Sequence, residues 1–191
     1  MGTKRIVALA ATLVLMLALP AGAKQPWSGP AGDATIVETA VALSGTPNTF
    51  DDNAGDFDIL VAAVLATGVN SSVLNGMDDY TVFAPTDQAF LDLASALAGS
   101  DIDNEATAFS TIAGAVGVDG VAAVLAYHVT EGVRNSKSVT SAKSIVMLDG
   151  NRITARSSSI EAIGSDAGFV GTDIRLADGM IHVIDSVLLP F

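Results

Sequence analysis

The sequence predicts an α+β fold in a single domain, because helical patterns come first along the chain and strand patterns mostly come later. Before residue 127, apolar residues recur mainly at the spacings of amphipathic helices. From Val133 onward the sequence changes to short β-rich runs, separated by turn signals such as DGN at 149–151 and DG at 178–179. This segregation favours α+β over a β-α-β alternation. With 191 residues, half of them apolar, the chain can bury one sizeable core.

The first 23 residues have the pattern of an export signal. Two cations precede an apolar run at 6–19, and AGA at 21–23 supplies the small residues that a signal peptidase requires. The alternative is a membrane anchor, which needs about 20 apolar residues, and this run is shorter and is followed at once by a cleavable site. We therefore expect a signal peptide at 1–23 that is removed after Ala23, and a secreted or periplasmic protein.

Composition limits the partners and the means of stabilisation. The chain has no cysteine, which excludes disulfides and a lipid-modified cysteine, so packing alone must hold the fold. Nine Lys and Arg stand against 21 Asp and Glu, a formal net charge of −12. Such an acidic field repels phosphate backbones and anionic headgroups. We therefore expect no nucleic-acid partner and, once the signal is cleaved, no membrane insertion.

The domain is expected to run over 33–191, after a flexible lead-in at 24–32 that has two prolines and two glycines. Asp33 or Thr35 is placed to cap a first helix, in which the apolar residues between Ile36 and Leu43 form one stripe.

A loop at 44–56 should follow the first helix, and then a second, mostly buried helix at 57–68 that ends at Gly68. A short helical turn is expected around 72–75.

The stretch YTVFAPTDQAF at 80–90 predicts a strand that runs directly into a helix. Alternation changes to helical spacing at Pro85, where the side chain of Thr86 could accept an N–H two or three residues ahead. Asp87 would lie in the first turn, where the helix dipole favours an anion. We interpret Thr86 and Asp87 as a structural corner, since a role as nucleophile and base would need a histidine nearby in the sequence.

Beyond this corner the sequence predicts two short helices, near 109–116 and 119–126, and then a strand at YHV. The later strands are expected at SIVML (144–148), RITA (152–155), SIEAI (159–163), DIRLA (173–177), MIHVID (180–185) and SVLLP (186–190).

Three spaced motifs carry a resemblance to a known family. In order, YTVFAPTDQAF, AYHVTEG at 126–132 and DGMIHVIDSVLLP at 178–190 resemble the fasciclin domain, over about 34–190. The chain departs from the usual pattern in a longer acidic loop at 44–56 and an insertion at 101–108. The resemblance implies a wedge of β-sheets with a group of short helices packed on one side. It also implies an extracellular or periplasmic protein that acts in adhesion or matrix binding, without a general catalytic activity.

The same resemblance puts forward Tyr127 and His128 as candidate binding residues, because this pair is associated with receptor binding in the family. On a strand, however, neighbouring side chains point to opposite faces, so at least one of the two must point inward. We predict that Tyr127 is buried, because a large aromatic beside apolar residues is typical of a core.

No catalytic residue is predicted. The chain has only two histidines, and no G-x-S-x-G elbow that would expose a nucleophilic serine. His182 and Asp185 should point to opposite faces of a strand, since their separation is odd. We assign both to the structural motif of the last strand.

No metal site and no cofactor are predicted either. The acidic segments that begin at Asp51 and Asp101 both fail the EF-hand pattern, since Ala62 and Ile112 stand where the terminal glutamate belongs. Calcium binding of another kind by these loops is left open. Two histidines without cysteine do not make a structural zinc site.

The sequence therefore predicts an exported, non-enzymatic binding module of the fasciclin type. It would mediate cell-surface or matrix interactions with an extracellular or envelope protein or glycan. One alternative is a periplasmic binder of small molecules or carbohydrates, which should have a deep pocket with convergent polar groups. The other is an unrecognised hydrolase, in which His128 or His182 would lie open to solvent and within reach of a serine.

Overall fold

The computed structural model describes residues 34–45, 49–51, 53–69 and 79–191. The predicted signal peptide at 1–23, the lead-in at 24–32 and the helical turn near 72–75 lie outside these residues.

A seven-stranded sheet forms the centre of the domain, in the order β2-β1-β7-β6-β5-β4-β3. The strands are β1 (Tyr80–Pro85), β2 (Val129–Glu131), β3 (Ile145–Val146), β4 (Arg152–Ala155), β5 (Ser159–Glu161), β6 (Asp166–Leu176) and β7 (Gly179–Ile184). Strands β1 and β7 are parallel, and every other pair is antiparallel. After β3 the chain returns to β2, where the N–H of Leu148 donates to the carbonyl of Val129 at 2.9 Å. The sheet is therefore nearly closed.

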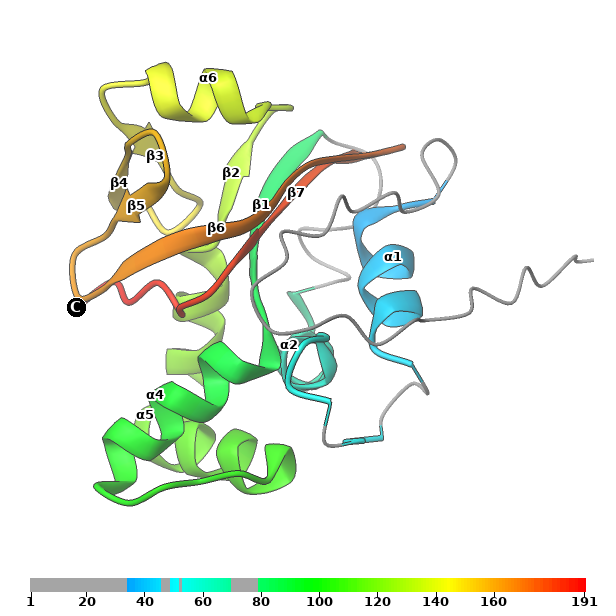
Figure 1. Ribbon diagram of the computed structural model, residues 1–191, viewed down its shortest axis with the longest axis vertical. Coiled ribbons are helices and arrows are strands. Elements are labelled where there is room, and N and C mark those ends of the chain that lie inside the picture. The colour runs from blue at the N-terminus through cyan, green and yellow to red at the C-terminus, as the bar shows by residue number, and fades with distance from the viewer. Residues whose placement is uncertain (1–33, 46–48, 52, 70–78) are drawn as a thin grey trace, which may run out of the picture.

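The helices gather mainly around one part of this sheet. They are α1 (Ile36–Leu43), α2 (Asp58–Thr67), α4 (Asp87–Ala98), α5 (Glu105–Ala126) and α6 (Ser136–Ser141). In Figure 1, α4 and α5 lie at one end of the molecule, α1 and α2 lie along one flank, and α6 lies at the other end beside β3 to β5. The predicted α+β class is confirmed, with most of its helices packed against one region of a curved sheet.

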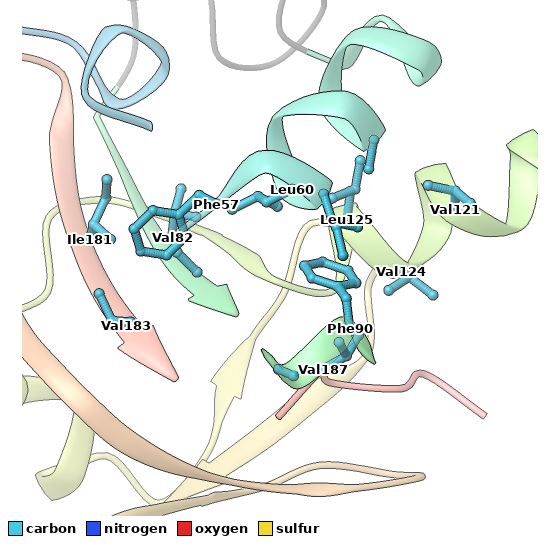
Figure 2. Close-up of a cluster of buried hydrophobic side chains, with 14 of the residues drawn as sticks. Phe57, Leu60, Val82, Phe90, Val121, Val124, Leu125, Ile181, Val183 and Val187 are labelled. Atoms are coloured by element: carbon cyan, nitrogen blue, oxygen red, sulfur yellow. The ribbon is translucent and has the colours of Figure 1, made fainter. Parts of the chain in front are cut away.

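Two clusters of buried side chains form the core. The larger one packs β1 and β7 against α2, α4 and α5 (Figure 2), and its labelled members include Phe57, Leu60, Val82, Phe90, Leu125 and Ile181. The smaller one fills the β-rich half and contains Phe83, Tyr127, Ile153, Ile160 and Ile184. Successive side chains of a strand point to opposite faces, so Val82 and Phe83 belong to different clusters.

The predicted start of α1 and the predicted end of α2 are confirmed. Thr35 caps α1 in a capping box, in which its hydroxyl accepts the N–H of Glu38 and the Glu38 carboxylate accepts the N–H of Thr35. Gly68 ends α2 in the left-handed conformation, at φ 69°.

The break between the two predicted middle helices is confirmed at Gly117, but the first of them begins earlier than predicted. α5 begins at Glu105 rather than near 109, because Asn104 caps it by accepting the N–H of Thr107, and it continues to Ala126 with one break at Gly117. α6 was not predicted at all, because its serine-rich sequence has weak helix propensity. It forms because Asn135 caps it and Val139 is fully buried beneath it.

The last part of the chain also differs from the prediction. β6 begins at Asp166, well before the predicted DIRLA run, and the segment after Ile184 forms no strand. The early start of β6 reflects its antiparallel pairing with β5, in which Asp166 lies opposite Glu161.

α5 is the one helix among the described residues whose length and mean hydropathy, 1.7 over its best window, would suit a membrane span. Its backbone leaves helical geometry at Gly117, where φ is 71° and ψ is 170°. Ala108, Ile112 and Leu125 contribute to the larger core cluster. Through these side chains α5 packs against the domain's core.

Candidate functional site

The predicted corner at Thr86 and Asp87 exists, but its hydrogen bonds differ from the prediction. Thr86 is the N-cap of α4, yet its side chain makes no capping hydrogen bond, so that part of the prediction was wrong. Asp87 is fully buried and caps a different helix: its carboxylate accepts the N–H groups of Asp58 and Ile59 at 2.8 and 2.9 Å. The N-cap of α2, Phe57, has no capping side chain of its own, so Asp87 supplies the missing acceptor.

The N-terminus of α4 is satisfied by the loop before α2 in return. The N–H of Asp87 donates to the carbonyl of Asp56 at 3.0 Å, and the N–H of Gln88 donates to the carbonyl of Ala54 at 2.8 Å. The two helix starts thus cap one another across 30 residues of sequence. The corner is structural, as interpreted from the sequence, although through contacts that local spacing does not show.

Tyr127 is buried, as predicted, but it does not lie on a strand. It is the C-cap residue of α5, and β2 begins only at Val129. Its side chain is 0% exposed, and its hydroxyl donates to the carbonyl of Arg152 at 3.0 Å and accepts the N–H of Ile163 at 3.2 Å. Burial raises the pKa of this hydroxyl. Tyr127 therefore joins the end of α5 to β4 and to the segment after β5.

His128 is also buried, at 2% exposure, so both members of the candidate pair lie inside the domain. Its Nδ1 lies 2.7 Å from the carbonyl of Val124, and its Nε2 accepts the N–H of Leu188 at 2.9 Å. Since a carbonyl only accepts, Nδ1 carries the proton. Burial lowers the pKa of His128 to about 4, because the interior disfavours the charged ring. The imidazole is neutral and connects α5 to the C-terminal segment.

His182 and Asp185 occupy separate environments, as their odd spacing predicted. His182 is fully buried: its Nε2 donates to the carbonyl of Arg134 at 2.8 Å, and its ring stacks on Phe83. Asp185 instead accepts the N–H of Gly168 at 2.6 Å. Neither residue forms part of a serine–histidine–aspartate arrangement in the described part of the chain.

A group of carboxylates that sequence reasoning missed lies where three helices begin. It consists of Asp51, Asp56, Asp58, Asp87 and Glu105, and we call it the acidic cluster. One oxygen each from Asp56, Asp87 and Glu105 lie within 4.8 Å of one another, and the same holds for Asp51, Asp56 and Asp58. All except Asp51 are buried, with exposures between 0 and 6%.

The hydrogen bonds of the acidic cluster come mostly from backbone groups. The N–H of Asp51 lies 3.2 Å from the carboxylate of Asp58 and 3.1 Å from that of Glu105. The amide of Asn53 donates to Oδ2 of Asp56 at 2.9 Å. These bonds position the carboxylates without neutralising them.

Burial and mutual repulsion perturb the titration of the acidic cluster. The pKa of Asp58 is raised to about 6, first by burial and then by the charges of Asp56 and Asp51. The pKa of Asp87 is raised to about 8, first by burial and then by a hydrogen bond shared with the Asp56 carboxyl, although two backbone N–H groups oppose this shift. The fold therefore holds the carboxylates of the acidic cluster together at a cost in free energy from burial and mutual repulsion.

Two cavities in the described part of the chain are small and apolar. One of about 50 Å³ lies between α1, α2 and the sheet, and another of about 60 Å³ lies between α4, α5 and the C-terminal segment. Both are lined by apolar atoms, and both are far smaller than the roughly 300–1,000 Å³ of a typical ligand site. Neither cavity has the convergent polar groups of a sugar or small-molecule site.

These features define an α+β domain in which Tyr127, His128 and His182 are buried and connect parts of the core. Comparison with known proteins identifies its family: the Fasciclin domain matches residues 55–190, which is more than half of the chain. The chain belongs to the fasciclin domain family.

Two other proteins are similar to this chain. The chain is 29% identical over 117 residues to Protein sll1483 from Synechocystis sp., a match that covers 61% of this chain and 58% of that protein. It also resembles the solved structure of a FAS1 domain pair from the insect cell adhesion molecule fasciclin I, with a TM-score of 0.58 and 14% identity. That match covers 86% of this chain and 51% of the pair, and at this identity it shows the fold alone. The chain thus spans less than two thirds of each relative.

The acidic cluster has one sequence signal, which is weak when the sequence is considered alone. α2, α4 and α5 each begin with an acidic residue, namely Asp58, Asp87 and Glu105. An acid at a first helical position is common because the dipole favours it, so this signal becomes informative only when the three helix starts meet in space.

Proposed function

We propose that this protein is an exported, non-enzymatic binding module of the fasciclin type, which attaches to an extracellular or envelope protein or glycan. The observation that carries the proposal is membership of the fasciclin family over residues 55–190. Domains of this family usually belong to extracellular or secreted proteins and are linked to adhesion. The export pattern at 1–23 supports the same location.

The chemistry of the histidines supports a non-enzymatic role. All four ring nitrogens of His128 and His182 lie within hydrogen-bond distance of backbone groups. A general base must reach the proton that it removes, and both rings are almost completely buried. The hydrolase alternative therefore lacks an accessible histidine base.

The cavities likewise favour a surface contact over an enclosed ligand. A small-molecule binder buries most of its ligand in a pocket with a few fixed polar groups, and the two cavities described above lack both the volume and the polar groups. A partner is thus expected to bind the outer surface of the domain.

A pull-down with the purified protein tests the proposal. Immobilised protein is incubated with envelope and extracellular fractions of the producing organism, and a glycan array is probed in parallel. We expect a protein or glycan that is retained specifically and that free protein displaces. Absence of any displaceable partner from both experiments would contradict the binding role.

A matched pair of variants keeps the pull-down interpretable. Phe191→Ala removes a side chain that is 66% exposed, whereas Tyr127→Phe changes one that is fully buried. If binding uses the surface, Tyr127→Phe should keep its affinity as long as the domain is folded.

A further inference from the structure

We propose that the acidic cluster is a calcium site, in which Asp56, Asp87 and Glu105 bind the ion from the starts of α2, α4 and α5, with Asp51 and Asp58 on its outer side. The site would join the starts of three helices to one another. It is independent of the identity of any binding partner.

The spacing of the oxygens fits one ion. Calcium binds oxygen ligands at about 2.3–2.6 Å, so two ligands on opposite sides of the ion are separated by roughly twice that distance. The oxygens of Asp56, Asp87 and Glu105 lie within 4.8 Å of one another, which allows all three to contact a single ion. Asp56 also belongs to the second group, with Asp51 and Asp58, and is therefore the central ligand.

Asp56 carries the observation that distinguishes this cluster from an ordinary acidic surface. Its side chain is 94% buried, because its exposure is only 6%. Oδ2 accepts a hydrogen bond from Asn53, but Oδ1 is buried and accepts none from a donor group of the described residues. The carboxylate of Asp56 also lies beside those of Asp87 and Glu105. Its unpartnered oxygen is therefore placed to bind a cation that these carboxylates share.

The charges around the cluster do not balance its negative charge, so a cation would be stabilised there. When all four buried carboxylates are ionised they carry four negative charges, of which the three helix starts offset about 0.5 each. Among the described residues, the ion pair of Arg156 with Glu161 is the only one formed by a lysine or arginine. No basic side chain of the described residues therefore neutralises the cluster, and a divalent ion would.

The ligand atoms select a hard cation. All of them are carboxylate oxygens, and the cluster has neither the imidazole nor the thiolate that zinc or copper prefers. Magnesium demands a nearly ideal octahedron at about 2.0–2.1 Å and gives up its waters reluctantly. Carboxylates from three helices and a loop, at mixed depths, suit the irregular coordination of calcium better.

Calcium titration of the purified protein tests this proposal. The protein is stripped with a chelator, and its melting temperature is measured as calcium chloride is added, with magnesium chloride as the comparison. An ion that binds only the folded state raises the melting temperature once its concentration exceeds the dissociation constant. We expect a saturable rise with calcium, a smaller rise with magnesium, and direct binding of about one calcium per chain by calorimetry.

Variants locate the site. Asp56→Asn and Glu105→Gln keep the side-chain shape but remove a ligand charge, and each should weaken calcium binding tenfold or more. Asp103→Asn is the matched control, because Asp103 is an exposed acid near the start of α5, and it should bind calcium as the wild type does. Asp51→Asn provides a third test at an exposed position if a buried variant fails to fold.

The proposal is wrong if millimolar calcium produces neither heat of binding nor a rise in melting temperature in the wild-type protein. It is also wrong if Asp51→Asn and the folded buried variants bind calcium as tightly as Asp103→Asn, because the ion would then lie elsewhere.

Discussion

Replacement of Tyr127 tests whether the tyrosine–histidine motif stabilises the domain from inside. Tyr127 is 0% exposed and packs with Phe83, Ile153, Ile160 and Ile184. Removal of a buried aromatic ring costs about 3–5 kcal/mol, so Tyr127→Ala should lose a large share of the roughly 5–15 kcal/mol that holds a domain. In a domain of this size about 1 kcal/mol corresponds to about 2–4 °C. We therefore expect the melting temperature of Tyr127→Ala to fall by about 10 °C.

Tyr127→Phe separates the hydroxyl from the ring. The hydroxyl makes two hydrogen bonds, to the carbonyl of Arg152 and from the N–H of Ile163. Each is worth about 1 kcal/mol net, so this variant should lose about 2 kcal/mol. Phe191→Ala is the control for aromatic truncation at the surface and should change stability by less than about 0.5 kcal/mol.

Chemical denaturation and thermal melting of these three variants and of His128→Ala provide the measurements, with partner affinity determined on the same samples. The reasoning is refuted if Tyr127→Ala and His128→Ala both keep the wild-type melting temperature while affinity for a partner falls tenfold or more. That outcome would make the pair an exposed contact surface.

Three further predictions follow from the same contacts. His128 should make the domain acid-sensitive: its folded pKa of about 4 lies below the ordinary 6.5, so its stabilising contribution is complete above pH 6.5 and is lost as the pH falls toward 4. Between pH 7 and pH 4.5 the free energy of unfolding should fall by about 2 kcal/mol because of His128. The measurement compares how this free energy depends on pH in the wild type and in His128→Gln. Equal pH dependence of the two proteins would contradict the prediction. Gly168→Ala should destabilise by about 1–3 kcal/mol in urea unfolding, because the added Cβ would lie 2.5 Å from the Asp185 carboxylate. Gly114→Ala in α5, with open space at that position, should be neutral or stabilising, and equal effects of the two substitutions would count against this account. The exported protein should begin at Lys24 by intact-mass measurement, and a secreted product that retains 1–23 would refute the signal-peptide prediction.

Local sequence patterns predicted those parts of the fold that depend on near neighbours. Thr35, one of the two predicted caps, starts α1, and Gly68 ends α2 as predicted. The burial of Tyr127 followed from its apolar surroundings. For the two helix ends, the interactions that decide the structure lie within a few residues.

Features that depend on distant contacts escaped the sequence analysis. Local spacing pointed to Thr86 as the cap of its own helix, whereas the decisive bonds connect Asp87 to the start of α2, 28 and 29 residues away. α6 forms through a buried Val139 that its weak local propensity does not reveal.

The acidic cluster shows the same limit for the site. A calcium-loop pattern examines one continuous segment, and both acidic segments fail it. The structure instead assembles Asp56, Asp87 and Glu105 from three segments, up to 49 residues apart in the chain. Only the packing of α2, α4 and α5 brings these side chains together, so a pattern confined to one loop could not find them.

Adhesion of protein-coated beads to cells of the producing organism tests the binding role most directly. Beads coated with the purified protein should attach to the cells in a saturable manner, and an excess of soluble protein should displace them. Beads that carry folded Tyr127→Phe protein should attach equally well, because that side chain lies in the core. If wild-type beads attach no better than beads coated with heat-unfolded protein, the protein is not an adhesive module for these cells.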